Sequence, residues 1–237
     1  MQITGGLMNI LSFGGSGVGF ELAREFAKHP ENTVCVAGTQ QEKVENCNMQ
    51  FEPFYINHSS FIDPFMTKIL TKRYSERNPV DLVILGSGGF YASGSITQTP
   101  PETIRKMLLL GIELPVRIVQ QVLAHSRGAL SFIFVGSVSQ DDPRESETMY
   151  CAVKAATVMF AQCVAMNPGV TKTLVVAPAR LRKAGCESSD PVRERAKLDP
   201  EWIARESYEQ FIGSEFRYRC IKFTRNPPRM TIRESRI

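Results

Sequence analysis

Short apolar runs alternate with stretches of helical periodicity along the chain, and this alternation predicts the fold class. The apolar runs are typical of buried strands, and they comprise Leu7–Phe13, Thr33–Ala37, Phe51–Ile56, Asp81–Leu85, Ala129–Val135, Thr171–Val176 and, as a candidate seventh, Tyr218–Phe223. Helical spacing favours helices over Phe20–Lys28, Gln41–Asn46, Pro64–Tyr74, Pro101–His125, Met149–Met166 and Asp199–Phe211. Strands that are apolar throughout and alternate with helices predict an α/β fold, a doubly wound parallel sheet of about seven strands with helices on both faces.

Three residues refine these expected elements. Pro53 cannot donate a hydrogen bond to a sheet ladder, so the third strand should lie at a sheet edge or begin late. Asp63 is placed to cap a helix that begins at Pro64. Pro115 should bend the long helix from 101 to 125.

The composition is that of a globular protein. The chain has 237 residues, 43% hydrophobic and 22% charged, which excludes collagen-like, long disordered and disulfide-stapled classes. A single domain over residues 1–237 is favoured. Within it we expect a short polar loop region at about 179–200, which would contact a substrate, and a basic C-terminal tail at 217–237.

The formal net charge of +4 is too small to indicate a partner, but its distribution is uneven. The tail 217–237 holds seven basic side chains and one acidic side chain. Such a tail could contact nucleic acid or an anionic membrane. A solvated terminus or a subunit contact is favoured instead, because no pattern of basic and aromatic residues typical of nucleic-acid binding accompanies it.

Cysteine and histidine usage indicates the compartment. None of the six cysteines forms a C-x-x-C pair, and no cysteine–histidine spacing resembles a zinc site. A signal peptide begins with basic residues, but no Lys or Arg precedes Arg24. No stretch reaches the ~20 apolar residues of a membrane span. We therefore expect a reduced cytoplasmic protein with free thiols, no metal and no membrane partner.

A glycine-rich loop lies between the first expected strand and the first expected helix. It consists of Gly14, Gly15, Ser16, Gly17, Val18 and Gly19. Missing side chains let a phosphate approach the backbone, and the helix N-terminus favours an anion there. A tight turn without a ligand is the alternative, but the flanking strand and helix favour nucleotide binding.

The end of the second strand bears on which dinucleotide would bind. A dinucleotide fold that prefers NAD usually carries an acid at this position for the ribose hydroxyls. This chain has Gly38, Thr39 and Gln40 there, so a ribose 2′-phosphate would not be repelled and could accept hydrogen bonds from Thr39 and Gln40. The pattern favours NADP over NAD, although no Arg or Lys stands at the position.

The candidate chemistry lies in Ser137, Tyr150 and Lys154. Tyr150 and Lys154 are four residues apart on an expected helix and share a face, while Ser137 ends the fifth strand. A phenol with a pKa of about 10 is a poor acid or base near neutrality, and a neighbouring ammonium would lower that pKa. Tyr150 could then act as a general acid or base while Ser137 polarises a carbonyl oxygen. A Tyr–Lys pair is also common on helices that have no catalytic role.

These residues resemble the short-chain dehydrogenase/reductase family over about residues 7–180. Ser137, Tyr150 and Lys154 match its catalytic serine, tyrosine and lysine in order and spacing. The resemblance implies a Rossmann-like fold in which Lys154 also holds the nicotinamide ribose. It also implies cofactor contacts from the glycine loop and from Asn57, Gly86, Ser87, Gly88 and Pro178.

Several positions depart from the family pattern. Gly14, Gly17 and Gly19 give G-x-x-G-x-G, one residue shorter than the usual G-x-x-x-G-x-G. The usual Asn-Asn-Ala-Gly after the fourth strand is replaced by Gly86-Ser87-Gly88-Gly89, and the family's helix asparagine aligns with Gly111. The proton relay through that asparagine is therefore missing unless Glu113 or a water replaces it.

The resemblance implies an NADP(H)-dependent oxidoreductase that interconverts a small-molecule carbonyl and its alcohol by hydride transfer. It also implies a homo-oligomer, dimer or tetramer, built on the helices at about 101–125 and 149–166. The alternative is a catalytically weak or inactive protein of this fold that acts as a dinucleotide-binding or regulatory module. The shortened glycine loop and Gly111 motivate that alternative, and the intact Ser137, Tyr150 and Lys154 argue against it.

Overall fold

A computed structural model describes residues 7–45, 47–55, 58–74, 78–86, 92, 94–126, 128–181, 197–225 and 227–234. Within these ranges an eight-stranded sheet has the order β3-β2-β1-β4-β5-β6-β7-β8. The strands are β1 (Asn9–Phe13), β2 (Thr33–Gly38), β3 (Gln50–Pro53), β4 (Leu82–Leu85), β5 (Leu130–Val135), β6 (Val170–Pro178), β7 (Tyr218–Thr224) and β8 (Arg229–Glu234). All neighbours pair in parallel except β7 and β8. The predicted doubly wound α/β fold is confirmed.

The strand order locates the crevice in which such folds bind ligands. From β1 the chain builds β2 and β3 on one side, then returns to place β4 on the other side of β1. In open α/β sheets ligands bind beyond the carboxyl ends of the strands, where the order reverses. Here that point lies between β1 and β4.

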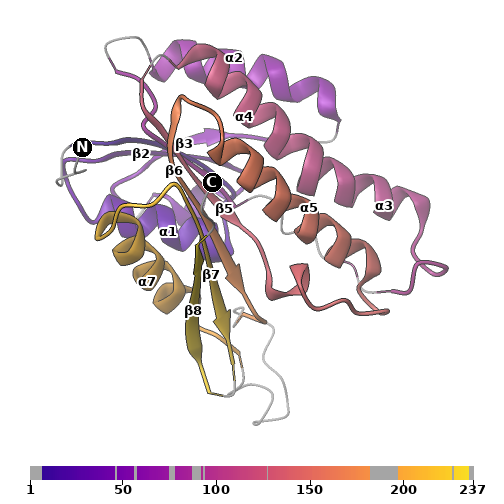
Figure 1. The fold of residues 1–237 in the computed structure, drawn as a ribbon. Coiled ribbons are helices and arrows are strands. Elements are labelled where there is room, and N and C mark those ends of the chain that lie inside the picture. The colour runs from indigo at the N-terminus through magenta and orange to yellow at the C-terminus, as the bar shows by residue number, and fades with distance from the viewer. Residues whose placement is uncertain are drawn as a thin grey trace.

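Helices cover both faces of the sheet (Figure 1). One face carries α1 (Gly17–Ala27) and α7 (Pro200–Ile212), which pack against each other. The other carries α2 (Ile62–Arg73), α3 (Pro101–Leu108), α4 (Leu114–His125) and α5 (Thr148–Ala165). Successive strand residues alternate between the two cores, so Leu11 and Phe13 face the α2–α4–α5 side while Ile10 faces α1 and α7.

The C-terminal tail differs most from the sequence expectation. The candidate seventh strand, Tyr218–Phe223, is confirmed as β7, but residues 229–234 add an unexpected antiparallel strand, β8, at the sheet edge, where a solvated terminus or subunit contact was expected. Arg219 pairs with Glu234 across the hairpin and stacks on the Phe216 ring at 4.3 Å. Lys222 forms a 2.6 Å ion pair with Asp141. Part of the basic excess is therefore used inside the fold.

One helix start and the course of the long helix also differ from expectation. Asp63 does not cap a helix at Pro64, because α2 begins two residues earlier, at Ile62, and Asp63 lies inside it. Its carboxylate instead accepts a 2.6 Å hydrogen bond from Arg117 of α4. The long helix from 101 to 125 is interrupted before Pro115 by a π-turn, Leu109–Glu113. Pro115 has no N–H for the carbonyl of Gly111, which disfavours regular α-helix there.

The expectation that no stretch is apolar enough for a membrane span needs correction. Pro101–His125 and Thr148–Ala165 are long and apolar enough by length and composition, with mean hydropathies of 1.5 and 1.3. In the structure α4 and α5 pack against the sheet, whereas α3 extends beyond it (Figure 1). Core helices meet the same criterion, so this finding alone is weak support for a membrane contact.

Candidate active site

The candidate site lies along the carboxyl ends of β1, β4 and β5. Gly14 follows β1, Gly86 follows β4 and Ser137 follows β5 after one intervening residue. The backbone N–H of Gly14 donates to Ala37 at 3.0 Å, and that of Gly86 donates to Phe13 at 2.9 Å. Ladder hydrogen bonds thus fix the loops in place at the crevice between β1 and β4.

The glycine loop adopts conformations that favour glycine. Gly14 has φ 117° and Gly17 has φ 67°, both in the region that side chains with a Cβ disfavour. Gly17 begins α1, and a Cβ added there would meet no described atom within 4 Å. Ser16 has extended backbone and makes no side-chain cap among the described residues. The first N–H groups of α1 are thus left to face an anion.

Gly19, in the first turn of α1, and Gly86, after β4, are in direct backbone contact. A Cβ at Gly19 would lie 2.6 Å from the Cα of Gly86, and a Cβ at Gly86 would lie 2.8 Å from the Cα of Gly19. Real Cβ atoms essentially never approach so closely. The start of α1 is therefore pressed against the end of β4. Val18, between Gly17 and Gly19, is buried in the core, so only its backbone is available to a ligand.

The end of β2 lies beside this loop. A Cβ on Gly15 would be 3.5 Å from the Cβ of Gln40, which is ordinary contact. The side-chain oxygen Oε1 of Gln40 is buried without a hydrogen-bond partner among the described residues. Thr39 is exposed. The Gln40 side chain is thus next to the glycine loop.

Ser137, Tyr150 and Lys154 come together at the carboxyl edge of β5. Ser137 precedes the short helix η4 (Val138–Gln140), and its side chain is hydrogen-bonded to Tyr150. Tyr150 and Lys154 lie one turn apart near the start of α5. The Lys154 ammonium is 5.7 Å from the centre of the Tyr150 ring.

Opposing influences act on the Tyr150 phenol. Burial raises its pKa above the ordinary value of 10.0, and the Ser137 hydrogen bond opposes that rise. The Glu147 carboxylate raises the pKa further, whereas the Arg144 guanidinium lowers it. The sequence argument assigned the lowering charge to Lys154, but the cation that lowers the Tyr150 pKa in the structure is Arg144.

Lys154 is held in one position by its surroundings. Its side chain is 3% exposed, and Nζ donates a 2.9 Å hydrogen bond to the carbonyl of Val135. Burial lowers the pKa of Lys154 to about 8. The amine is therefore mainly an ammonium at neutral pH and reaches the neutral form in mildly alkaline solution.

Sequence reasoning missed Ser139 and Arg144, which complete the polar cluster around Ser137. The side chain of Ser137 donates to Ser139 Oγ at 3.0 Å, and Arg144 donates to the same oxygen. Arg144 is also paired with Glu147 at 2.9 Å. No periodicity marks these loop residues, although their position between Ser137 and Tyr150 could have drawn attention to them.

The remaining predicted positions are less informative. Pro178 ends β6 and is buried. Asn57, Ser87 and Gly88 lie outside the described residues. Gly111 is buried in the π-turn, and a Cβ there would lie 2.2 Å from Val153 Cγ1 of α5. An asparagine at this position would therefore require the Val153 side chain to move.

A family model described as "short chain dehydrogenase" matches residues 9–182, which span the whole site. This chain belongs to the short-chain dehydrogenase family. The resemblance to this family that the sequence motifs implied is confirmed.

Curated relatives carry the description "Probable oxidoreductase EphD", from Mycobacterium bovis and Mycobacterium tuberculosis. They are 24% identical to this chain over 213 residues, which is 81% of this chain and 35% of each relative. The chain thus spans about a third of the length of these relatives.

Solved structures of low sequence identity share the fold. A dehydrogenase/reductase from Sinorhizobium meliloti has a TM-score of 0.75 at 14% identity, covering 91% of this chain and 92% of its own. An alcohol dehydrogenase from Thermococcus sibiricus, complexed with 5-hydroxy-NADP, has a TM-score of 0.72 at 16% identity, covering 88% and 91%. Actinorhodin polyketide ketoreductase with NADPH has a TM-score of 0.74 at 17% identity, covering 94% and 98%.

Proposed function

We propose that this protein is an NADP(H)-dependent oxidoreductase that interconverts a small-molecule carbonyl and its alcohol. The convergence of Ser137, Tyr150 and Lys154 at the carboxyl edge of β5 carries the proposal. In the reduction, a carbonyl compound, NADPH and a proton give an alcohol and NADP⁺. The two structural neighbours solved with NADPH and with 5-hydroxy-NADP support the cofactor class.

The residues around the β1–β4 crevice fit a nicotinamide dinucleotide. Gly14 and Gly17 form a cradle that a Cβ would strain, and the uncapped start of α1 suits a pyrophosphate. Gln40 Oε1, which has no partner within the described part of the chain, is a hydrogen-bond acceptor left for a ligand. When bound, the nicotinamide supplies the hydride for the reaction. Lys154 would hold its ribose.

The chain's own residues handle the proton and the carbonyl oxygen. Ser137 donates a hydrogen bond to the carbonyl oxygen and orients it toward Tyr150. Tyr150 gives its phenolic proton to that oxygen in reduction and takes the proton back in oxidation. The Arg144 guanidinium, which lowers the Tyr150 pKa, favours the phenolate that reduction leaves behind.

NADP is favoured over NAD because no carboxylate stands at the end of β2. Thr39 and Gln40 are neutral, and both side chains have hydrogen-bond donors that can contact a 2′-phosphate. An acid at this position would repel the phosphate while accepting hydrogen bonds from a free ribose hydroxyl pair. The side chain at position 40 is therefore expected to set the cofactor preference.

A thermal-shift titration with NADPH, NADH, NADP⁺ and NAD⁺ tests the cofactor assignment. At about a hundred times its dissociation constant a ligand stabilises by about 2.7 kcal/mol, which corresponds to about 5–10 °C for a chain of this size. We expect this shift with NADPH, followed by turnover in a screen of aliphatic and aromatic ketones and aldehydes. Gln40→Asp should weaken the NADPH shift and preserve or strengthen the NADH shift. No shift with any of the four would contradict the proposal and favour a protein that has lost the dinucleotide.

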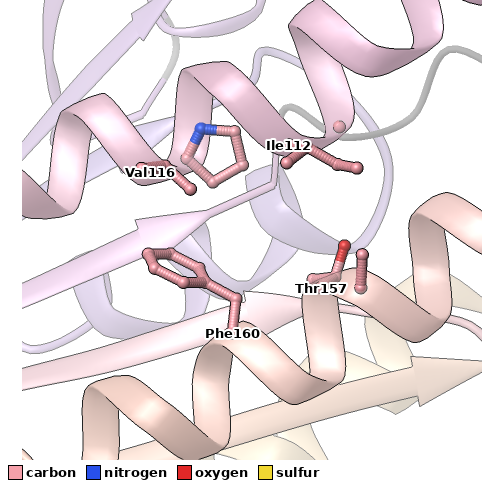
Figure 2. A pocket seen from close by; sticks show the side chains of 7 residues that line it. Ile112, Val116, Thr157 and Phe160 are labelled. Atoms are coloured by element: carbon pink, nitrogen blue, oxygen red, sulfur yellow. The ribbon is translucent and has the colours of Figure 1, made fainter.

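We also propose that α4 and α5 join two copies of the chain. Their outward faces expose Val116 and Met159, and Figure 2 shows Ile112, Val116, Thr157 and Phe160 around the apolar pocket between the two helices. Exposed apolar side chains on neighbouring helices are typical of a subunit interface. We expect sedimentation equilibrium to give a dimer or larger assembly. The double substitution Val116→Lys and Met159→Glu should give monomers, whereas Tyr55→Glu, a charge on the distant exposed Tyr55, should not.

A further inference from the structure

Arg144 lies in the segment between η4 and α5 and reaches Ser137 through a single residue. Its Nη2 group donates a hydrogen bond to Ser139 Oγ. Ser139 is 3% exposed and contacts Ser137 twice. The Ser137 hydroxyl donates to Ser139 Oγ at 3.0 Å, and the Ser139 backbone N–H donates to Ser137 Oγ at 3.2 Å.

We propose that Arg144 is a positioning residue that acts through Ser139 to orient the Ser137 hydroxyl against Tyr150. The inference rests on the proposed function, because it assigns a purpose to the Ser137–Tyr150 pair. It adds two side chains, Arg144 and Ser139, to the residues on which the reaction would depend.

The hydrogen-bond capacities of the two serines explain the positioning. A hydroxyl oxygen has two acceptor lone pairs and one proton that rotates freely. Ser139 Oγ accepts from both Ser137 and Arg144, so both of its lone pairs are occupied. Ser137 Oγ accepts the Ser139 N–H and gives its proton to Ser139, which leaves one lone pair for Tyr150. Arg144 thereby fixes the position of Ser137 Oγ through Ser139, and the Ser137 proton turns from Ser139 to the carbonyl oxygen when a substrate binds.

Arg144 also acts on Tyr150 through its charge, which lowers the pKa of the phenol. Two charged groups, Arg144 and Glu147, act on the phenol with opposite signs, and Cys151 acts in the same direction as Glu147. Lys154 lies one turn further along α5. Arg144 is paired with Glu147 at 2.9 Å and approaches Asp142 at 3.7 Å. Its charge is thus balanced within the protein, which argues for an internal role over capture of an anionic substrate.

The reactivity of the Tyr150 phenol toward N-acetylimidazole tests this without any substrate. The reagent acetylates the phenolate, so the rate at fixed pH follows the phenolate fraction. Below the pKa, that rate falls about tenfold for each unit by which the Tyr150 pKa rises. Mass spectrometry of the Tyr150 peptide at pH 8 gives the rate. The exposed Tyr55 serves as the reference within the same molecule.

Arg144→Met and Glu147→Gln form a pair with opposite expected outcomes. Loss of the Arg144 cation should lower the Tyr150/Tyr55 acetylation ratio by about threefold to tenfold, and loss of the Glu147 carboxylate should raise it. Arg144→Lys should restore part of the ratio, since it retains the charge. An unchanged ratio in Arg144→Met, or a shift of the same sign in both variants, would overturn the proposal.

Ser139→Ala tests whether Arg144 acts through Ser139. In that background Arg144→Met should change the ratio less than it does in the wild type, because contacting residues are not additive. An undiminished change would show that Arg144 acts by charge alone and would contradict the proposed path. NADPH thermal shifts of all variants should equal that of the wild type. If the wild type binds no dinucleotide and turns over no carbonyl, the proposed function fails while the acetylation result still decides the role of Arg144.

Discussion

Tyr150→Phe is expected to abolish carbonyl reduction while leaving cofactor binding intact. The substitution removes one oxygen and keeps the ring that packs near Lys154. Loss of a general acid typically lowers the rate by 10²–10⁴-fold, so kcat should fall by about this factor. The NADPH thermal shift should stay within about 1 °C of the wild-type value. Single-turnover and steady-state reduction of the best ketone from the screen measure kcat.

Ser137→Ala is the matched comparison for this prediction. It removes the hydrogen bond to Tyr150 but leaves a proton donor in place, so kcat should fall by less than in Tyr150→Phe. The double variant should be no slower than Tyr150→Phe alone, because residues that act as one unit are not additive. If Tyr150→Phe kept most of the wild-type kcat, Tyr150 would not be the acid.

The sheet could be predicted because a buried parallel strand is apolar throughout. The apolar run at Leu7–Phe13 contains β1, and Thr33–Ala37 matches β2 to within one residue. Pro53 indicated an edge strand, and β3 does lie at the edge of the sheet. β8 escaped prediction because Arg229–Glu234 is an exposed edge strand whose side chains are largely polar. Its pairing with β7 gives no apolar signal in the sequence.

Motif spacing could identify Ser137, Tyr150 and Lys154, but it could not identify the polar groups that surround them. Ser139 and Arg144 meet only because η4 and the segment after it turn the chain back toward β5. Loop residues carry no periodicity, so such contacts depend on backbone geometry that the sequence pattern does not encode. For the same reason, the sequence argument named Lys154 and not Arg144 as the cation that lowers the Tyr150 pKa.

Gly19→Ala is expected to destabilise the protein strongly and to remove cofactor binding. An alanine in a helix is normally more stable than glycine by up to about 1 kcal/mol, so propensity alone predicts a gain. The added Cβ would instead lie 2.6 Å from the Cα of Gly86, a backbone atom that cannot rotate away. Overpacking of this kind costs about 1–3 kcal/mol, which corresponds to a fall in Tm of about 3–10 °C.

Gly15→Ala is the control for Gly19→Ala, because its Cβ would make an ordinary 3.5 Å contact with Gln40 in the same loop. Its Tm should stay within about 2 °C of the wild type. The start of α1 would have to move away from β4 in Gly19→Ala, and the N–H groups proposed to hold the pyrophosphate would move with it. The folded variant should therefore no longer bind NADPH, and its Tm should not rise when NADPH is added. A Gly19→Ala protein as stable as the wild type and still bound to NADPH would show that the start of α1 and the end of β4 are not in contact. The crevice between β1 and β4 would then have to be built differently.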